Sequence, residues 1–156
     1  MKKFNIILAT LLVLCIGLGV YFHVGSALDA RLHKVTASAA SYPEAYQSIV
    51  NVLSAGAAPQ QFAETLPAME NCTLMDVSIR LSNKGLFPAE WIDVSLQPAE
   101  GDIAVYSLTG ATSDIAGLSD GQINLKLITT ASPVATRSVD LTYYVFGARR
   151  TLHLTF

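Results

Sequence analysis

The sequence predicts a mainly β protein with an N-terminal transmembrane helix, a short helical segment and then an antiparallel β-sandwich. Three observations lead to this fold class. An uncharged, mostly apolar run extends from Phe4 to Leu28, apolar residues recur at helical spacing after Ser41, and apolar and polar residues alternate after Asn71. The predicted parts are a transmembrane signal-anchor (1–28), a juxtamembrane stalk and helical segment (29–70) and the sandwich (71–156).

The apolar run is long enough to cross a bilayer. Residues 4–24 read FNIILATLLVLCIGLGVYFHV, and a helix needs roughly 20 residues to span the hydrocarbon core. The apolar centre of a cleavable signal is shorter, about 7 to 15 residues. We therefore expect an uncleaved anchor that contacts the lipid bilayer through residues 4–24. Gly25-Ser26-Ala27 also fits a small-x-small cleavage site, and cleavage after Ala27 would give a secreted protein.

The charges beside the run do not fix its orientation. Lys2 and Lys3 before it are balanced by Arg31 and Lys34 after it, so the positive-inside rule favours neither side. The short tail before Phe4 is typical of a signal-anchor whose N-terminus stays in the cytoplasm. We therefore expect a single-pass protein of the cell membrane with its C-terminal part outside the cytoplasm.

The two cysteines are not predicted to form a disulfide. Residues 12–15, LVLC, begin like a lipoprotein signal, but Leu14 stands where that signal has a small residue, and the apolar run continues past Cys15. Cys15 is therefore expected to be a small apolar helix residue. Cys72 is the only cysteine outside the run, so the sandwich cannot close a disulfide within itself. We expect it to be a buried thiol, with pairing to another chain as the alternative.

A short helix is predicted before the sandwich. Residues 26–40, SALDARLHKVTASAA, are small and polar, and we expect a stalk or a continuation of the anchor helix there. Ser41 can cap a helix that Gly56 ends. The predicted helix carries one apolar stripe, formed by Tyr42, Ala45, Tyr46, Ile49, Val52 and Leu53. A further helical turn is expected from Pro59 to Leu66.

Six strands are predicted after Asn71, because the apolar period changes there from 3.6 to 2. Turn residues separate them, such as Asn83-Lys84-Gly85 and Gly147. Short alternating strands with turns between them and no helices indicate an antiparallel sandwich. The six predicted strands cover residues 75–81, 92–96, 103–108, 123–127, 139–145 and 152–156.

Two stretches of this region resemble a known family. Residues 77–85, VSIRLSNKG, and residues 117–121, GLSDG, ahead of the strand 122–129, are similar to turn motifs in immunoglobulin-like modules of bacterial and archaeal surface proteins. The resemblance is to the CARDB-like and LEA14-like sandwiches, over about residues 72–156. It implies an immunoglobulin-like sandwich that acts as a spacer, adhesion or assembly domain, and it brings no catalytic residues.

Charge and histidine spacing exclude two other classes of function. The net charge of −2 and the pI near 5.8 offer no basic surface for nucleic acid. His23, His33 and His153 are scattered, without the spacing of a zinc site. No cofactor is predicted.

Four acidic residues would lie in loops at the ends of a sandwich, where carboxylates can hold calcium. Their spacing matches no calcium-binding loop, so we expect solvated charges instead. The four are Glu100, Asp102, Asp114 and Asp120.

One motif matches a hydrolase signature. Residues 117–121 satisfy Gly-x-Ser-x-Gly around Ser119, and Asp140 and His153 follow in the Ser, Asp, His order of α/β-hydrolases. A nucleophile elbow needs a helix after the serine, whereas residues 122–129 alternate as a strand. We therefore expect no enzymatic activity and no catalytic residues.

Two further features have alternative interpretations. Trp91, the only tryptophan, falls on the face opposite Ile92, where we expect it to cover a sheet under the predicted helix; a ligand platform is the alternative. Arg149 and Arg150 are expected at a hairpin tip. They are either solvated turn residues or contacts for anionic headgroups or wall polymers.

These observations predict a non-enzymatic, membrane-anchored interaction or assembly module of the cell envelope, with an unidentified envelope protein as partner. One alternative is a pilin-like subunit, although residues 1–5 offer no cleavage site before the apolar run and that run lacks glutamate. A second alternative is a sandwich that holds an apolar ligand, and a third is the serine hydrolase.

Overall fold

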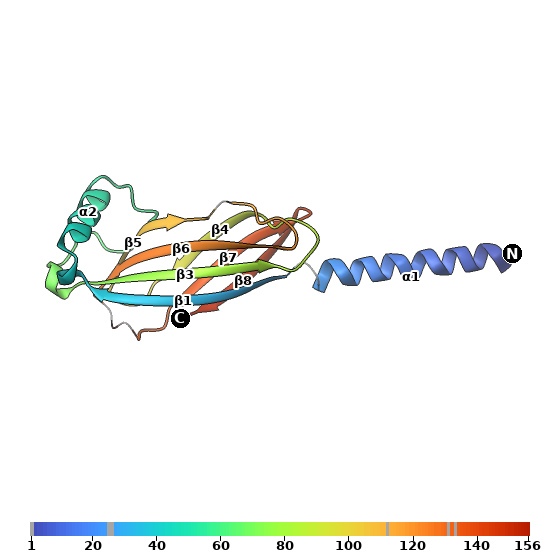
Figure 1. Cartoon of the computed structure of the whole chain (residues 1–156), viewed down its shortest axis with the longest axis horizontal. Helices are drawn as coiled ribbons and strands as arrows, with labels where there is room; N and C mark the ends of the chain where they lie inside the picture. The colour runs from blue at the N-terminus through green and yellow to red at the C-terminus, as the bar shows by residue number, and fades with distance from the viewer. Residues whose placement is uncertain (1, 25–26, 112, 131, 133) are drawn as a thin grey trace.

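The structure of this protein is a computed structural model, and it describes residues 2–24, 27–111, 113–130, 132 and 134–156. The chain is mainly β, with two antiparallel sheets and an N-terminal apolar helix (Figure 1). Gly25 and Ser26 of the possible cleavage site lie outside the described residues.

Helix α1 (Lys2–Val24) extends away from the sheets (Figure 1). Its segment from Lys3 to Tyr21 is long and apolar enough to cross a membrane, and none of it is buried against the rest of the chain. A helix that is apolar on all sides finds no partner for its side chains in water. A membrane anchor and a signal sequence both have this character.

Strand β1 (Leu28–Ser38) follows α1 almost directly, and it corrects our expectation of a stalk or a continued helix over residues 26–40. It pairs along its whole length with β3 (Thr73–Asn83). Leu28, Ala30 and Leu32 alternate with charged residues and pack against the core, which is the period-two pattern of a strand. The small and charged residues around them concealed this alternation.

The strands form a five-stranded sheet, in the order β1-β3-β6-β5-β2, and a three-stranded sheet, in the order β4-β7-β8. All six predicted strands are confirmed, whereas β1 and β2 were missed. The remaining strands are β2 (Gln60–Gln61), β4 (Glu90–Gln97), β5 (Asp102–Thr109), β6 (Ser119–Thr129), β7 (Ser138–Val145) and β8 (Ala148–Thr155).

The two sheets face each other across one apolar core, and together they form what we call the two-sheet unit, residues 28–156. Alternate residues of each strand point into this core, as half-buried antiparallel sheets require. The central strands supply most of it: Met75, Val77, Ile79 and Leu81 from β3, Ile123, Leu125 and Leu127 from β6, and Val139, Leu141, Tyr143 and Val145 from β7.

A charged side chain covers the open edge between the sheets. Lys34 follows Leu32 on the inward-facing side of the edge strand β1, and its Nζ lies 5.7 Å from the centre of the Phe156 ring. A cation over an aromatic face is held by the ring quadrupole. An inward-facing charge on an edge strand also opposes pairing with another strand.

Helix α2 (Pro43–Ser54) confirms the predicted helix, with a different start. A 3₁₀ turn, η1 (Ala39–Ser41), precedes it, and Tyr42 rather than Ser41 occupies the N-cap position. Gly56 ends the helix as predicted. It has a φ of +64°, and its N–H donates to Leu53 O at 3.0 Å, as in a Schellman C-cap.

Helix α2 covers the end of the five-stranded sheet that lies farthest from α1 (Figure 1). Ile49 is fully buried against a second small apolar cluster on the outer face of that sheet. Tyr42 and Ala45 of the predicted stripe are exposed. The other members of this cluster include Cys72, Ile103, Ala104 and Ile128.

The predicted helical turn over Pro59–Leu66 is wrong, because β2 pairs with β5 within that segment. Phe62 packs against the core between the sheets, whereas Leu66 packs against the cluster under α2. A helix would place residues four apart on one face, so the chain must extend to reach both clusters. A second 3₁₀ turn, η2 (Met69–Asn71), leads into β3.

Candidate functional site

The three residues of the hydrolase motif do not come together. Asp140 and His153 face each other across β7 and β8, with 2.6 Å between Asp140 Oδ1 and His153 Nδ1. Ser119 begins β6 in the other sheet, where its Oγ donates to Ala116 O at 2.7 Å. A Ser-His-Asp mechanism needs the serine hydroxyl within hydrogen-bond reach of the histidine. The Ser119 hydroxyl is therefore not positioned by the Asp140–His153 pair.

The four acidic residues considered as calcium ligands lie at opposite ends of the two-sheet unit. Glu100 and Asp102 lie at the end of the sheets away from α1, whereas Asp114 and Asp120 lie at the end near α1. The described residues contain no group of three or more acidic, histidine or cysteine side chains with metal-site geometry. The expectation of a solvated charge is wrong for Asp102, which is buried with its carboxylate bound to an arginine.

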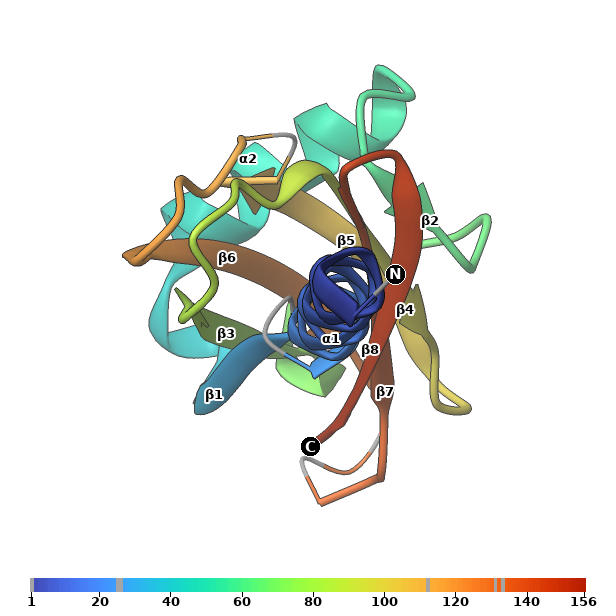
Figure 2. The same cartoon turned by 90° about the vertical axis from the view of Figure 1, so that its right-hand side faces the viewer.

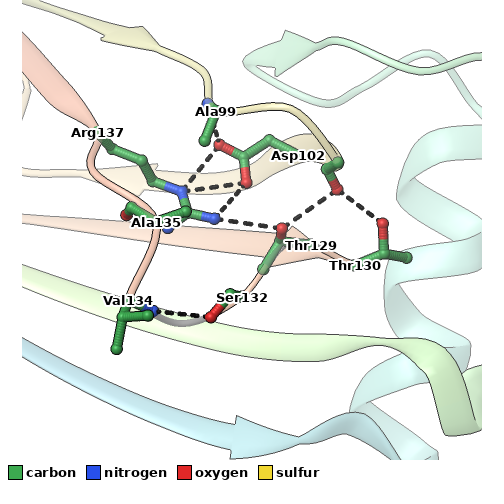
Figure 3. Close-up of polar contacts among 9 residues, drawn as sticks. Ala99, Asp102, Thr129, Thr130, Ser132, Val134, Ala135 and Arg137 are labelled. Atoms are coloured by element: carbon green, nitrogen blue, oxygen red, sulfur yellow. Dashed lines mark hydrogen bonds and ion pairs between the residues drawn. The ribbon is translucent and has the colours of Figure 1, made fainter.

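That arginine belongs to a buried polar network between the sheets (Figure 3). Arg137 and Asp102 form an ion pair in which both side chains are 0% exposed, with Nη2 and Oδ1 2.6 Å apart. Arg137 Nε also donates to Oδ2 at 2.9 Å, and Nη1 donates to Ala135 O at 3.0 Å. The charge of the guanidinium is thus neutralised and its donors are satisfied by groups around it.

The network ties the chain together at the end away from α1. Asp102 Oδ2 accepts a hydrogen bond from Ala99 N, and the Thr129 hydroxyl donates to Gly101 O (Figure 3). Backbone bonds between Arg137 and Phe156 bind the arginine to the last residue of the chain. Because the side chains of Arg137, Asp102 and Thr129 are buried, we interpret this network as structural rather than as a binding site.

The outer face of the five-stranded sheet is polar over the half nearer α1. A groove of about 630 Å³ runs across β1, β3, β6 and β5. Ser78 Oγ donates to Asn124 Oδ1 at 2.7 Å in its floor. Its lining is mostly uncharged polar side chains, and the full set is His33, Val35, Asp76, Ser78, Ser107, Thr109, Asn124 and Lys126.

A second, smaller groove on the same face is strongly charged. Arg31 and Arg80 lie opposite each other in the β1–β3 register, and Asp29 and Lys84 line the same groove. The Lys84 ammonium, 3.0 Å from Asp29 Oδ2, donates a hydrogen bond that holds the pKa of Asp29 below its ordinary value. Like charges directly opposite each other oppose strand pairing, and the acidic side chains of Asp29 and Asp120 line the same groove as the two arginines.

The end of the unit beside α1 is formed by three loops that we call the α1-side loops: residues 84–89, residues 110–118 apart from 112, and residues 146–147. Figure 2 looks at this end, with α1 projecting toward the viewer among the loops. A hydrogen bond from Leu86 N to Tyr21 Oη, 2.9 Å long, joins the first loop to α1.

A buried asparagine fixes two of these loops to each other. Asn83 Nδ2 donates to the carbonyl oxygens of Phe87, Ile115 and Ala116 at 2.8 to 3.1 Å. Its Oδ1 accepts from Gly85 N at 3.0 Å, which forms the turn that the sequence motif predicted. The two loops are therefore held as one rigid base.

Four large apolar side chains project from this base and its surroundings. Leu86 is 62% exposed, Trp91 74%, Leu118 70% and Phe146 61%. Three of the four, all but Leu86, have positive φ values of 52° to 56°, and they are the only such non-glycine residues in the described part of the chain. We call these four side chains the apolar rim.

Trp91 therefore differs from our expectation. It does not lie under α2 or in a core; it lies at a bulge in β4, with its ring edge-on to Tyr144 at a centroid distance of 5.9 Å. Its backbone N–H donates to Asp114 Oδ1 at 3.0 Å. The expectation that Arg149 and Arg150 lie at the hairpin tip is wrong. The tip is Phe146-Gly147, and both arginines lie within β8, where they pair with Tyr144 and Tyr143 of β7.

The cysteines lie in two different environments. Cys72 is buried, as predicted, and its burial raises the pKa of its thiol. A buried, protonated thiol is a poor nucleophile for disulfide exchange. Cys15 lies on α1 with its side chain exposed.

No protein-family model matches this chain, and no curated protein matches it. The resemblance to the CARDB-like and LEA14-like sandwiches therefore stays a prediction. The function must be inferred from α1 and from the surfaces described above.

Sequence reasoning missed the apolar rim and the buried ion pair. Arg137 and Asp102 each stand directly before or at the start of a strand, but nothing in their spacing pairs them. The rim had one detectable signal: Phe146 stands directly before Gly147 in a two-residue hairpin, where asparagine is the preferred residue.

Proposed function

We propose that this protein is a single-pass, membrane-anchored interaction module of the cell envelope, with its two-sheet unit outside the cytoplasm. The observation that carries the proposal is α1, an apolar helix of 23 residues whose segment from Lys3 to Tyr21 is not buried against the rest of the chain, joined closely to a folded β unit. A helix of this kind is stable when lipid surrounds it. A non-enzymatic role is supported by the separation of Ser119 from the Asp140–His153 pair.

The strand order supports an immunoglobulin-like sandwich for the exposed unit. The strand orders β1-β3-β6-β5 and β4-β7-β8 match A-B-E-D and C-F-G of constant-type immunoglobulin domains. The short strand β2 is added at the edge beside β5. Such folds serve many functions, so the fold gives the architecture and the surface gives the role. The pilin-like alternative is not favoured, because β1 stands where that layout has further helix.

Membrane extraction and mass measurement test the anchor. An uncleaved anchor resists carbonate extraction and gives the intact mass of residues 1–156, whereas a cleaved signal gives a soluble product lacking residues 1–27. Protease added to spheroplasts should remove the two-sheet unit and leave α1 protected. Protection of the whole chain would place the unit in the cytoplasm and contradict the proposal.

The partner surface that the geometry favours is the polar outer face of the five-stranded sheet. A photocrosslinking residue at Arg80, which is exposed on that face, should capture an envelope protein in intact cells. The matched control is the same residue at Asp93, which is exposed on the other sheet. Equal capture at both positions, or at neither, would contradict this assignment.

A further inference from the structure

We propose that the α1-side loops dock on the bilayer surface and insert the apolar rim into the lipid interface. This inference rests on the proposed function, in which α1 spans the membrane. It goes further by assigning lipid as the ligand of a second surface, separate from α1. Docking would hold the two-sheet unit upright on the membrane.

The short connection between α1 and β1 brings this end of the unit to the membrane. Only residues 25–27 separate Val24 from Leu28. At no more than about 3.6 Å per residue, the start of β1 stays within about 14 Å of the end of α1. The hydrogen bond from Leu86 N to Tyr21 Oη brings the first loop into direct contact with α1. A membrane-spanning α1 therefore leaves these loops at the level of the lipid headgroups.

The exposed side chains at this end are apolar and aromatic, which are residue types that favour the headgroup level of a bilayer. Leu86, Leu118 and Phe146 are exposed and belong to the α1-side loops, at the end of the unit next to the apolar helix. Exposed apolar groups that gather on a soluble surface mark an interaction site. Trp91 and its neighbour Tyr144 are the residue types that are enriched at membrane–water interfaces.

The backbone at the rim shows that turn geometry does not explain these residue types. Phe146 and Gly147 have φ values of 52° and 72°, which is a type I′ turn. Asn-Gly is the preferred pair there, because a bulky side chain is unfavourable at positive φ. Leu118 and Trp91 occupy the same unfavourable region. Apolar side chains in all three positions are accounted for by insertion into lipid.

The charges around the apolar rim indicate which lipid headgroup is needed for docking. Both signs are present, so the surface has no strong preference for anionic headgroups. Insertion of apolar groups is then the main source of binding, and zwitterionic lipid is enough. The charged residues at this end are Asp29, Lys84, Glu90, Asp114, Asp120, Arg149 and Arg150.

The single tryptophan reports on docking directly. We would reconstitute the full chain in phosphatidylcholine vesicles and confirm by flotation that it is anchored. The emission maximum of Trp91 should lie at a shorter wavelength than in the chain unfolded in urea without detergent. Iodide should not quench its fluorescence, whereas a lipid with a nitroxide at the headgroup should. The matched control is W91F/Y42W, which moves the tryptophan to Tyr42, 54% exposed at the α2 end. In this control, iodide should quench the tryptophan fluorescence and the nitroxide lipid should not.

A rim variant separates docking from anchoring. L86S/L118N/F146N should still float with vesicles through α1, and its Trp91 should become accessible to iodide. We expect this variant to stay folded, because asparagine tolerates positive φ. A cooperative unfolding transition in detergent is the control for this. Equal iodide quenching of Trp91 in the parent chain and of Trp in the control would overturn docking while leaving the anchor intact. Failure of the parent chain to float would overturn the proposed anchor, and docking with it.

Discussion

Removing the carboxylate of Asp102 should be among the most destabilising single changes in this protein. Arg137 donates three hydrogen bonds to it, from Nε to Oδ1 at 3.0 Å and to Oδ2 at 2.9 Å, and from Nη2 to Oδ1 at 2.6 Å. Both side chains are 0% exposed. In D102A the guanidinium stays buried with only Ala135 O and the Thr129 hydroxyl as acceptors.

The expected cost follows from that stranded charge. Breaking a buried ion pair by removing one partner costs about 3–5 kcal/mol, because the other charge remains in a medium of low polarity. For a unit of this size the midpoint of thermal unfolding should fall by about 10–20 °C. In D102L/R137M both charges are replaced by apolar groups, and the stability should return to within about 1 kcal/mol of the parent.

Urea unfolding of the full chain in detergent, followed by Trp91 fluorescence, measures these differences. The matched control is D76A, which breaks the exposed Lys126–Asp76 pair, 3.5 Å apart, and should cost no more than about 1 kcal/mol. A D102A cost as small as that of D76A would refute the reasoning. A double variant as unstable as D102A would refute the stranded-charge explanation specifically.

Three further predictions concern other parts of the two-sheet unit. N83A should lose about 2–4 kcal/mol of unfolding free energy, because three carbonyls and Gly85 N lose their buried partner; a loss below about 1 kcal/mol in urea titration would contradict the rigid base. L118N should gain about 1 kcal/mol in detergent by relieving positive φ, and a measured loss would argue against strain at that position. Burial raises the pKa of Cys72 and of Tyr106 above their ordinary values of 9.0 and 10.0, so both stabilise the folded state below those values. These two groups should therefore leave the urea midpoint unchanged between about pH 7 and 9 and lower it as the pH rises further, and a midpoint that rises with alkaline pH would contradict this assignment.

The sequence allowed six of the eight strands and α2 to be predicted, because their apolar periods are regular. Strand β1 was not predicted, because the small side chain of Ala30 at an inward-facing position weakens the apolar alternation between Leu28 and Leu32. Alternation placed Trp91 on the face opposite Ile92, but the helix expected to cover it is elsewhere, because α2 packs on the five-stranded sheet and Trp91 belongs to the three-stranded sheet. The pairing of Arg137 with Asp102 depends on the fold alone. Positive φ at Phe146 could not be predicted either, because a bulky residue normally argues against it.

The covered edge of β1 has a consequence for many copies in one membrane. Proteins confined to a plane meet at a high effective concentration, and proteins that stand upright present the same edges to one another. The 11 residues of β1 would then be a template for a continuous sheet from molecule to molecule. A new strand there would enclose the Lys34 ammonium over Phe156 and remove it from water, which is unfavourable. If the proposed anchor places many copies in one membrane, Lys34 would thus oppose sheet formation between neighbouring copies.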